Sequence, residues 1–88
     1  MVILRWTREA EIWLKDIHDY IEKDDRTVAD RVVNGIYRKA QLLLKFSKIG
    51  HLHKVENGEE IRILLYGHYR ITDLIKLDKN IEIGRAHV

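Results

Sequence analysis

Cysteine and proline are both absent from this chain of 88 residues. Without cysteine, neither a disulfide framework nor a thiolate metal site can form. Without proline, the ends of helices must be set by capping side chains, glycines and charge. The lack of thiols fits a reducing compartment, so we expect a cytoplasmic protein.

Long apolar runs are missing as well. The longest, Ile63 to Gly67, is far shorter than the roughly 18 residues that suggest a membrane-spanning helix. The N-terminal run is broken by Arg5 too soon to be a signal peptide, so no membrane partner is expected. An excess of one charge is also lacking, since the net charge is +2. That value is compatible with an acidic partner or with RNA and selects neither.

The composition that remains is that of a small globular domain, with 45% hydrophobic and 34% charged residues. The length predicts a single domain over residues 1–88. A domain of this size buries only about 60–65% of its unfolded surface, so its stability margin is thin. A tightly bound partner would therefore be a natural source of additional stability.

Helical periodicity dominates the first half of the chain, after a short β-rich run at 2–6 that predicts a strand. Thr7 is a candidate N-cap for a first helix ending near Lys23, and Asp25 or Thr27 is a candidate cap for a second helix from Val28 to Phe46. The two apolar stripes are Ala10, Trp13, Leu14, Ile17 and Ile21, then Ala29, Val32, Val33, Ile36, Ala40, Leu43 and Leu44. The short link between them predicts an antiparallel hairpin, with Trp13 in the core.

Extended patterns follow Gly50. They predict a weak, exposed edge strand at 51–55, an Asn-Gly turn at 56–59, and further strands at 61–66, 69–77 and 81–83. The element order is then β-α-α-β-β-β-β. Because the helices precede the meander, we expect an α+β fold in which both helices pack on one face of an antiparallel sheet.

Four short motifs occur in a specific order along the chain. They are Trp6-Thr7-x-x-Ala10, Ile49-Gly50, Glu60-Ile61-Arg62 and Gly67-His68-Tyr69-Arg70-Ile71. In this order and spacing the sequence resembles the RelE/ParE toxin superfamily over nearly its whole length. The resemblance implies a prokaryotic toxin of a type II toxin–antitoxin pair, neutralised by a cognate antitoxin protein.

The superfamily has two branches with different targets. RelE-like toxins cut mRNA on the ribosome with basic residues around the scissile phosphate, whereas ParE-like toxins poison DNA gyrase. Alignment on Tyr69-Arg70 puts the two lysine positions of the nuclease branch near Ile61 and Ile63, and strand alternation points Arg62 to the opposite face. The resemblance and the long helical hairpin therefore favour a ParE-like gyrase poison without catalytic residues of its own. A ribosome-dependent endoribonuclease is the alternative, and a detoxified relic or plain interaction domain is a third hypothesis.

Candidate site residues follow from the same resemblance. Arg62, Tyr69 and Arg70 are expected to contact the antitoxin or the target, although an arginine on a sheet is often only solvated or ion-paired. If the protein is a nuclease, the resemblance makes Arg70, Arg62 and Lys54 candidates, and His53 could serve with Lys54 as acid and base.

Neither a metal nor an organic cofactor is expected. His51 and His53 would share a strand face, but a zinc site needs at least a third ligand and none is evident nearby. Lys39, Lys45 and Lys48 gather near the end of the second helix, where positive charge favours the helix dipole and a solvated face explains them.

Two features depart from the superfamily. Asp73 occupies a strand position where relatives usually have an apolar or aromatic residue, and it would need a partner if it faced the core. The last six residues, 83–88, equal the translation of a common sequencing adapter in one frame. We therefore expect that this tail is not native and that the natural C-terminus is longer.

Overall fold

The computed structural model describes residues 1–87. Its elements are β1 (Leu4–Trp6), α1 (Arg8–Glu22), α2 (Arg26–Gln41), a 3-10 turn η1 (Leu42–Leu44), β2 (His51–Glu56), β3 (Glu59–Tyr66), β4 (Tyr69–Ile75) and β5 (Ile81–His87). The predicted order of one strand, two helices and four strands is confirmed.

The five strands form one sheet in the order β1-β5-β4-β3-β2. From β2 to β5 the sheet is the expected antiparallel meander, but β1 runs parallel to β5, with Leu4 opposite Ile81 and Trp6 opposite Ile83. The sheet is therefore mixed, which the expectation of an antiparallel sheet missed. Parallel neighbours need a long connection, and here the whole chain between β1 and β5 supplies it.

Side-chain caps start both helices. The Thr7 hydroxyl accepts a hydrogen bond from the Ala10 amide at 3.1 Å, and the Asp25 carboxylate accepts one from the Val28 amide at 3.2 Å. These bonds satisfy amides that have no partner within the helix. They confirm Thr7 as a cap and select Asp25, rather than Thr27, for the second helix.

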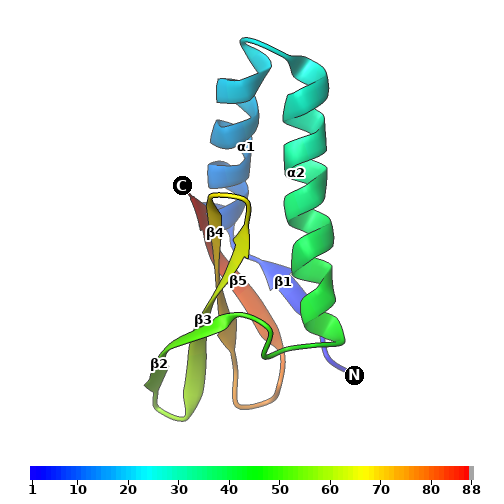
Figure 1. The fold of residues 1–88 in the computed structure, drawn as a ribbon. Coiled ribbons are helices and arrows are strands. Elements are labelled where there is room, and N and C mark those ends of the chain that lie inside the picture. The colour runs from blue at the N-terminus through cyan, green and yellow to red at the C-terminus, as the bar shows by residue number, and fades with distance from the viewer. Residues whose placement is uncertain (88) are drawn as a thin grey trace.

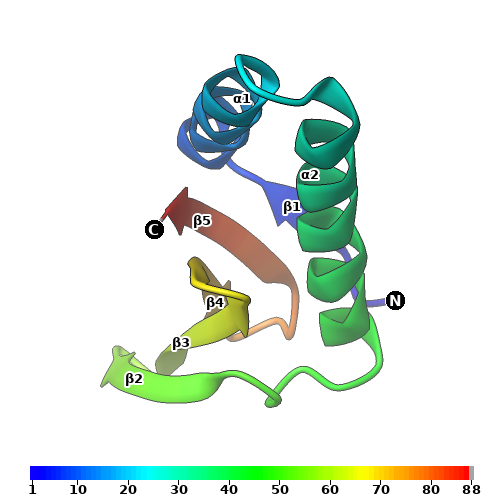
Figure 2. The same ribbon diagram turned by 45° about the horizontal axis from the view of Figure 1, so that its top comes forward.

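The helical hairpin covers one face of the sheet and extends well beyond it (Figures 1 and 2). The molecule is consequently elongated, measuring 43 × 22 × 21 Å. The core lies where the lower half of the hairpin meets the strands. Its buried apolar members are Ala10, Leu14, Ile17, Ile36, Ala40, Leu43, Leu64, Ile71, Ile75, Ile81, Ile83 and Ala86.

The second helix ends earlier than Phe46, at Gln41, and continues as the 3-10 turn η1. Because a 3-10 turn has about 3.0 rather than 3.6 residues per turn, side chains after it leave the helical stripe. Leu43 is fully buried, whereas Leu44 is 40% exposed. The prediction that Leu44 belongs to the buried stripe was therefore wrong.

Trp13 is also placed differently from the prediction, because it is 37% exposed while the adjacent Leu14 is buried. Trp13 lies on the flank of α1 beside the end of β5, where the sheet no longer covers the helix. Helical spacing predicted which side chains form the apolar stripe of α1. The length of the strands, which the spacing does not show, decides which part of that stripe is buried against the sheet.

Turn geometry agrees with the sequence, since Asn57 and Gly58 have φ values of 53° and 81°. Ile83 and His87 lie within β5, and Val88 lies outside the described residues. The non-native origin expected for 83–88 stays a prediction. Among the described residues, no helix is long and apolar enough to cross a membrane.

Candidate functional site

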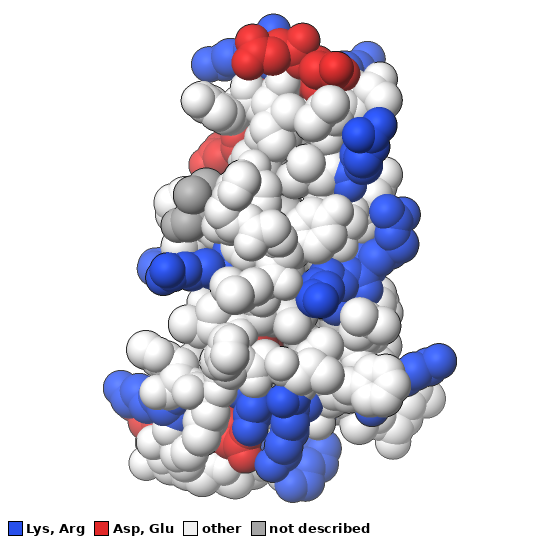
Figure 3. Space-filling model, in the orientation of Figure 1, with Lys and Arg blue, Asp and Glu red and all other residues white. Residues whose placement is uncertain are grey.

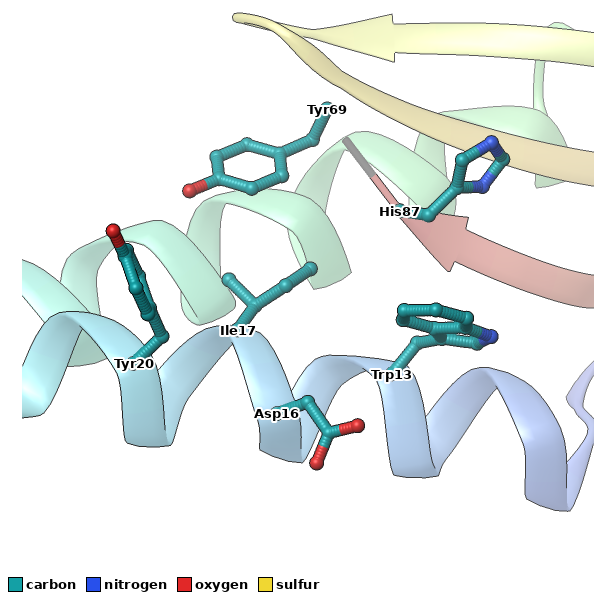
Figure 4. Close-up of a pocket in the computed structure, with 6 residues that line it drawn as sticks. All are labelled: Trp13, Asp16, Ile17, Tyr20, Tyr69 and His87. Carbon is teal, nitrogen blue, oxygen red and sulfur yellow. The ribbon is translucent and has the colours of Figure 1, made fainter.

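An open groove runs between α1 and the ends of β4 and β5. Its volume is about 390 Å³, and its lining residues are Trp13, Asp16, Ile17, Tyr20, Tyr69 and His87. In Figure 4, Trp13, Ile17 and Tyr20 project from α1 toward Tyr69 and His87. The Asp16 carboxylate points away from the sheet, so the groove itself is bordered mainly by rings and aliphatic carbon.

The groove exists because α1 continues past the strands that cover its first half. Tyr69 packs partly against the core, whereas Tyr20 is 74% exposed. The rings of Trp13 and His87 have centroids 6.4 Å apart. Large apolar groups that gather on an open surface indicate an interaction site, and aromatic side chains often dominate the binding energy of interfaces.

Arg70 lies next to the groove but does not line it, because its side chain points to the opposite face of the sheet from Tyr69. On β4 it follows Tyr69 directly, and its partners in register are Leu65 on β3 and His87 on β5. Burial lowers the pKa of His87, and the charges of Arg85 and Arg70 lower it further. The Arg70 side chain is exposed and makes no hydrogen bond or ion pair with any residue in the range 1–87. Its donors are available to an external partner.

Arg62 is placed quite differently, with only 12% of its side chain exposed. Its Nε donates to Glu60 Oε1 at 2.7 Å, and one terminal nitrogen donates to the carbonyls of Lys48 at 3.1 Å and Gly50 at 2.6 Å. These bonds fasten the segment after η1 to β3. The hydrogen bonds from Arg62 and then Lys48 also hold the pKa of Glu60 below its usual value.

Asp73 lies directly opposite Arg62 in the β3–β4 register. It is fully buried, and neither carboxylate oxygen has a hydrogen-bond partner. Burial raises the pKa of Asp73 from 3.8 to about 7, and the Arg62 charge opposes this rise only in part. The departure noted in the sequence is therefore real, because a carboxyl group faces the core without a bonded partner.

The four residues expected for a nuclease are not brought together. Lys54 pairs with Glu56 at 3.3 Å on the edge strand β2, and a bulge at His53 interrupts the alternation that would have put His51 and His53 on one face. Lys54 is opposite Ile61, and Arg70 is opposite Leu65 on the far side of β3. The Cα atoms of Lys54 and Arg70 are therefore about 16 Å apart, because two strand spacings and four residues along the strands lie between them.

Arg62 and Arg70 also lie on opposite faces of the sheet. Arg62 shares a face with Asp73, and residues of opposite parity on β4, such as Arg70, point the other way. The three residues expected to contact a partner therefore do not form one surface. Tyr69 lines the groove, Arg70 points to the opposite face of the sheet, and Arg62 is used within the fold.

One cluster with metal-ligand chemistry does occur, at His18, Asp19 and Glu22 on α1. Each member already has a partner: His18 bonds Asp30 at 2.7 Å, Asp19 bonds Lys15 at 2.7 Å, and Glu22 lies 3.6 Å from Arg26. The contact between His18 and Asp30 joins the two helices. The ion pairs within and between the two helices therefore account for this cluster without a metal ion.

The groove was not predicted from the sequence, since Trp13 was assigned to the core and Tyr20 was given no role. The available signal was the i, i+4, i+7 spacing of Trp13, Ile17 and Tyr20. That pattern places three large side chains on one flank of α1. It does not show that the sheet ends beneath them.

Comparison with known proteins identifies the class to which this fold belongs. Residues 4–85 match the model of the ParE toxin of type II toxin–antitoxin systems. A solved structure described as the chromosomal ParDE toxin–antitoxin system from P. aeruginosa has the same fold, with a TM-score of 0.73 and 24% identity. The match covers 99% of this chain and 95% of that one. No curated protein matches.

The chain belongs to the ParE toxin family, which matches nearly its whole length. It is therefore the toxin of a type II toxin–antitoxin pair, and its partner is an antitoxin.

Proposed function

We propose that this toxin arrests growth by poisoning DNA gyrase, and that its antitoxin neutralises it by occupying the groove between α1 and β4–β5. The match to the ParE family model over residues 4–85 carries the proposal. The groove and the free arginine beside it supply the binding surface.

The arrangement of basic groups supports protein binding rather than RNA cleavage. Cleavage through a 2′-hydroxyl needs a base, an acid and a cation around one phosphate. Alignment on Tyr69-Arg70 puts the lysine positions of the nuclease branch near Ile61 and Ile63, which are apolar, and Arg62 is held by Glu60 and two carbonyls. Lys54 lies about 16 Å from Arg70.

The groove suits the apolar side of an antitoxin segment. Trp13 and Tyr20 offer rings to it, and Arg70, paired with His87 beyond the edge of the groove, offers a charge to an acidic residue of the same segment. An aromatic centre with a charged rim is a common arrangement in protein interfaces. Bound antitoxin would also stabilise the thin core of the toxin by mass action.

The target is tested by expressing the toxin in cells and measuring both DNA damage and translation while growth stops. Induced expression should switch on the SOS response and produce DNA breaks while translation continues. Rapid translation arrest with codon-spaced cuts in mRNA, and no SOS response, would contradict the proposal and identify the ribosome.

A charge reversal tests the groove. Arg70→Glu should weaken both toxicity and antitoxin binding without changing the fold, and the binding of the unaltered pair should weaken as salt rises. Arg31→Glu, at an exposed position of α2, makes the same change of charge and serves as the control. An Arg70→Glu protein that binds antitoxin normally and still arrests growth would remove Arg70 from the site.

A further inference from the structure

A second cavity lies at the end of the molecule opposite the helical tip. It forms where η1, the β2–β3 turn and the β4–β5 turn meet, and its volume is about 390 Å³. Its polar lining consists of Lys45, Lys48, Lys76, Lys79, Ser47 and Glu60, and aliphatic side chains complete it. Two lysines follow η1 and two belong to the β4–β5 turn, so segments about thirty residues apart converge on one space.

The positive charge of this cavity is poorly compensated. Glu60 is the one acidic residue in the lining, and it already accepts hydrogen bonds from Arg62 at 2.7 Å and Lys48 at 3.1 Å. Within residues 1–87, Lys45, Lys76 and Lys79 form no ion pair. Three ammonium groups therefore face the cavity without a bonded carboxylate.

The acidic residues on the adjoining turns are occupied as well. The Asp78 carboxylate accepts from the Asn80 amide at 3.0 Å and from the Asn80 side chain at 3.3 Å. Glu59 accepts from the Leu77 amide at 3.3 Å. In Figure 3, basic side chains gather at the lower end of the view, where the β4–β5 turn lies in Figure 1.

We propose that this cavity binds a phosphate group, carried either by a free nucleotide or by a nucleic-acid strand. Lysine binds phosphate as a point charge, and several lysines can surround a tetrahedral anion without fixed geometry. The Ser47 hydroxyl adds a neutral donor. The aliphatic part of the lining lowers the local dielectric constant, which strengthens attraction between the ammonium groups and an anion.

The lining favours phosphate over the carboxylates of an acidic protein. The cations in its lining are lysines, and none is an arginine, the residue whose planar fork matches a carboxylate with two hydrogen bonds. Arg62 lies behind Glu60 and is not part of the lining. The lining also contains no aromatic ring to anchor a peptide, unlike the groove at Trp13. The volume falls within the range of about 300–1,000 Å³ that is usual for small-molecule sites.

The experiment compares three phosphate probes and one carboxylate probe on the purified full-length chain. Inorganic phosphate, thymidine monophosphate, a twelve-residue oligothymidylate and a polyglutamate peptide are titrated, with amide resonances and fluorescence anisotropy as readouts. The variant is Lys45→Gln/Lys76→Gln. Lys15→Gln/Lys23→Gln, on α1 and at its C-cap, removes the same charge far from the cavity and serves as the control. Circular dichroism verifies that both variants are folded.

We expect the amide resonances of 44–48 and 76–79 to shift with phosphate probes. With three available lysines, binding of the oligonucleotide should weaken about 20-fold between 50 mM and 200 mM salt, and about 3-fold in the variant that keeps one of them. At low salt that variant should bind at least tenfold more weakly, and the control should bind normally. Shifts with the monophosphate would identify the ligand as a free nucleotide, and shifts with the oligonucleotide alone would identify it as a nucleic-acid strand.

Three results would overturn the proposal. The first is the absence of any shift around the cavity at low salt, and the second is equal weakening in the control variant. The third is tighter binding of polyglutamate than of the oligonucleotide at the same residues, which would assign the cavity to an acidic protein. None of these results depends on whether gyrase is the toxin's target.

Discussion

Two arginines on neighbouring strands of the same sheet have opposite surroundings. Arg62 is almost covered and donates to one carboxylate and two carbonyls, and it lies opposite the buried Asp73. Arg70 is exposed on the other face of the sheet, next to His87 at the end of the aromatic groove, and its side chain has no bonded partner among residues 1–87. An arginine has five N–H donors, so the role of each depends on whether the fold uses them.

The same contrast holds for the regions around them. Near Arg62 the sheet is closed by the segment after η1, and polar groups inside it interact with one another. Near Arg70 the strands end while α1 continues past them, and the aromatic and aliphatic side chains of the groove are open to solvent. One region maintains the fold, and the other is available to a partner.

The largest expected loss of stability comes from a substitution that adds a carboxylate to the core, in addition to Asp73 and away from Arg62. Ile36→Asp or Leu43→Asp places a charge at a fully buried position. Each should cost more than about 4 kcal/mol and abolish the native fold. Circular dichroism during thermal unfolding measures this, and unchanged stability of either variant would show that the helix face has been misplaced.

Removal of each arginine tests the comparison itself. Arg62→Met leaves the Lys48 and Gly50 carbonyls without this donor and Glu60 with Lys48 alone, and should lower the free energy of unfolding by roughly 3–5 kcal/mol. Arg70→Met should change it by less than about 0.5 kcal/mol. Urea denaturation of both variants gives the two values, and similar losses would refute the division of roles.

Asp73 makes the stability depend on pH. Its pKa is raised in the folded state to about 7 from an ordinary 3.8, so between these values the folded chain binds a proton that the unfolded chain has lost. The contribution is fully present below pH 3.8 and is lost as pH rises to about 7, by about 4 kcal/mol in total. Asp73→Asn keeps the shape and cannot titrate.

Urea denaturation of both proteins from pH 4 to pH 8 measures the difference between them. The unaltered protein should lose stability relative to Asp73→Asn as pH rises through this range. Parallel curves would show that Asp73 is not buried as a neutral acid.

A substitution in the groove should affect partner binding more than stability. Trp13→Ser should cost about 1 kcal/mol of stability but weaken antitoxin binding by roughly 30-fold or more, as for a central aromatic contact. Ile12→Ser, at an exposed position next to it and outside the groove, is the control. Calorimetric titration with the antitoxin measures the affinity of both variants. Equal affinities would show that the antitoxin does not bind in the groove.

Local patterns in the sequence were enough to predict most elements of the fold. Thr7 and Asp25 cap the helices, the apolar stripes give their buried faces, and Asn57-Gly58 forms a turn with positive φ. These features depend on residues within a few positions of one another, and the chain shows them directly.

The parts that could not be predicted depend on contacts between distant residues. Arg62 is held by carbonyls of residues 48 and 50, and its position opposite Asp73 follows from the strand register. The groove depends on where the sheet ends beneath α1, and the parallel pairing of β1 depends on β5. The lysine cavity likewise joins two turns whose proximity no local pattern shows.

The central claim is tested most directly by adding the purified chain to DNA gyrase and plasmid DNA. We expect inhibited supercoiling and an accumulation of cleaved plasmid, both reversed by prior addition of the antitoxin and both reduced by Arg70→Glu. Normal supercoiling in the presence of a folded and growth-arresting chain, with no cleaved plasmid, would contradict gyrase as the target.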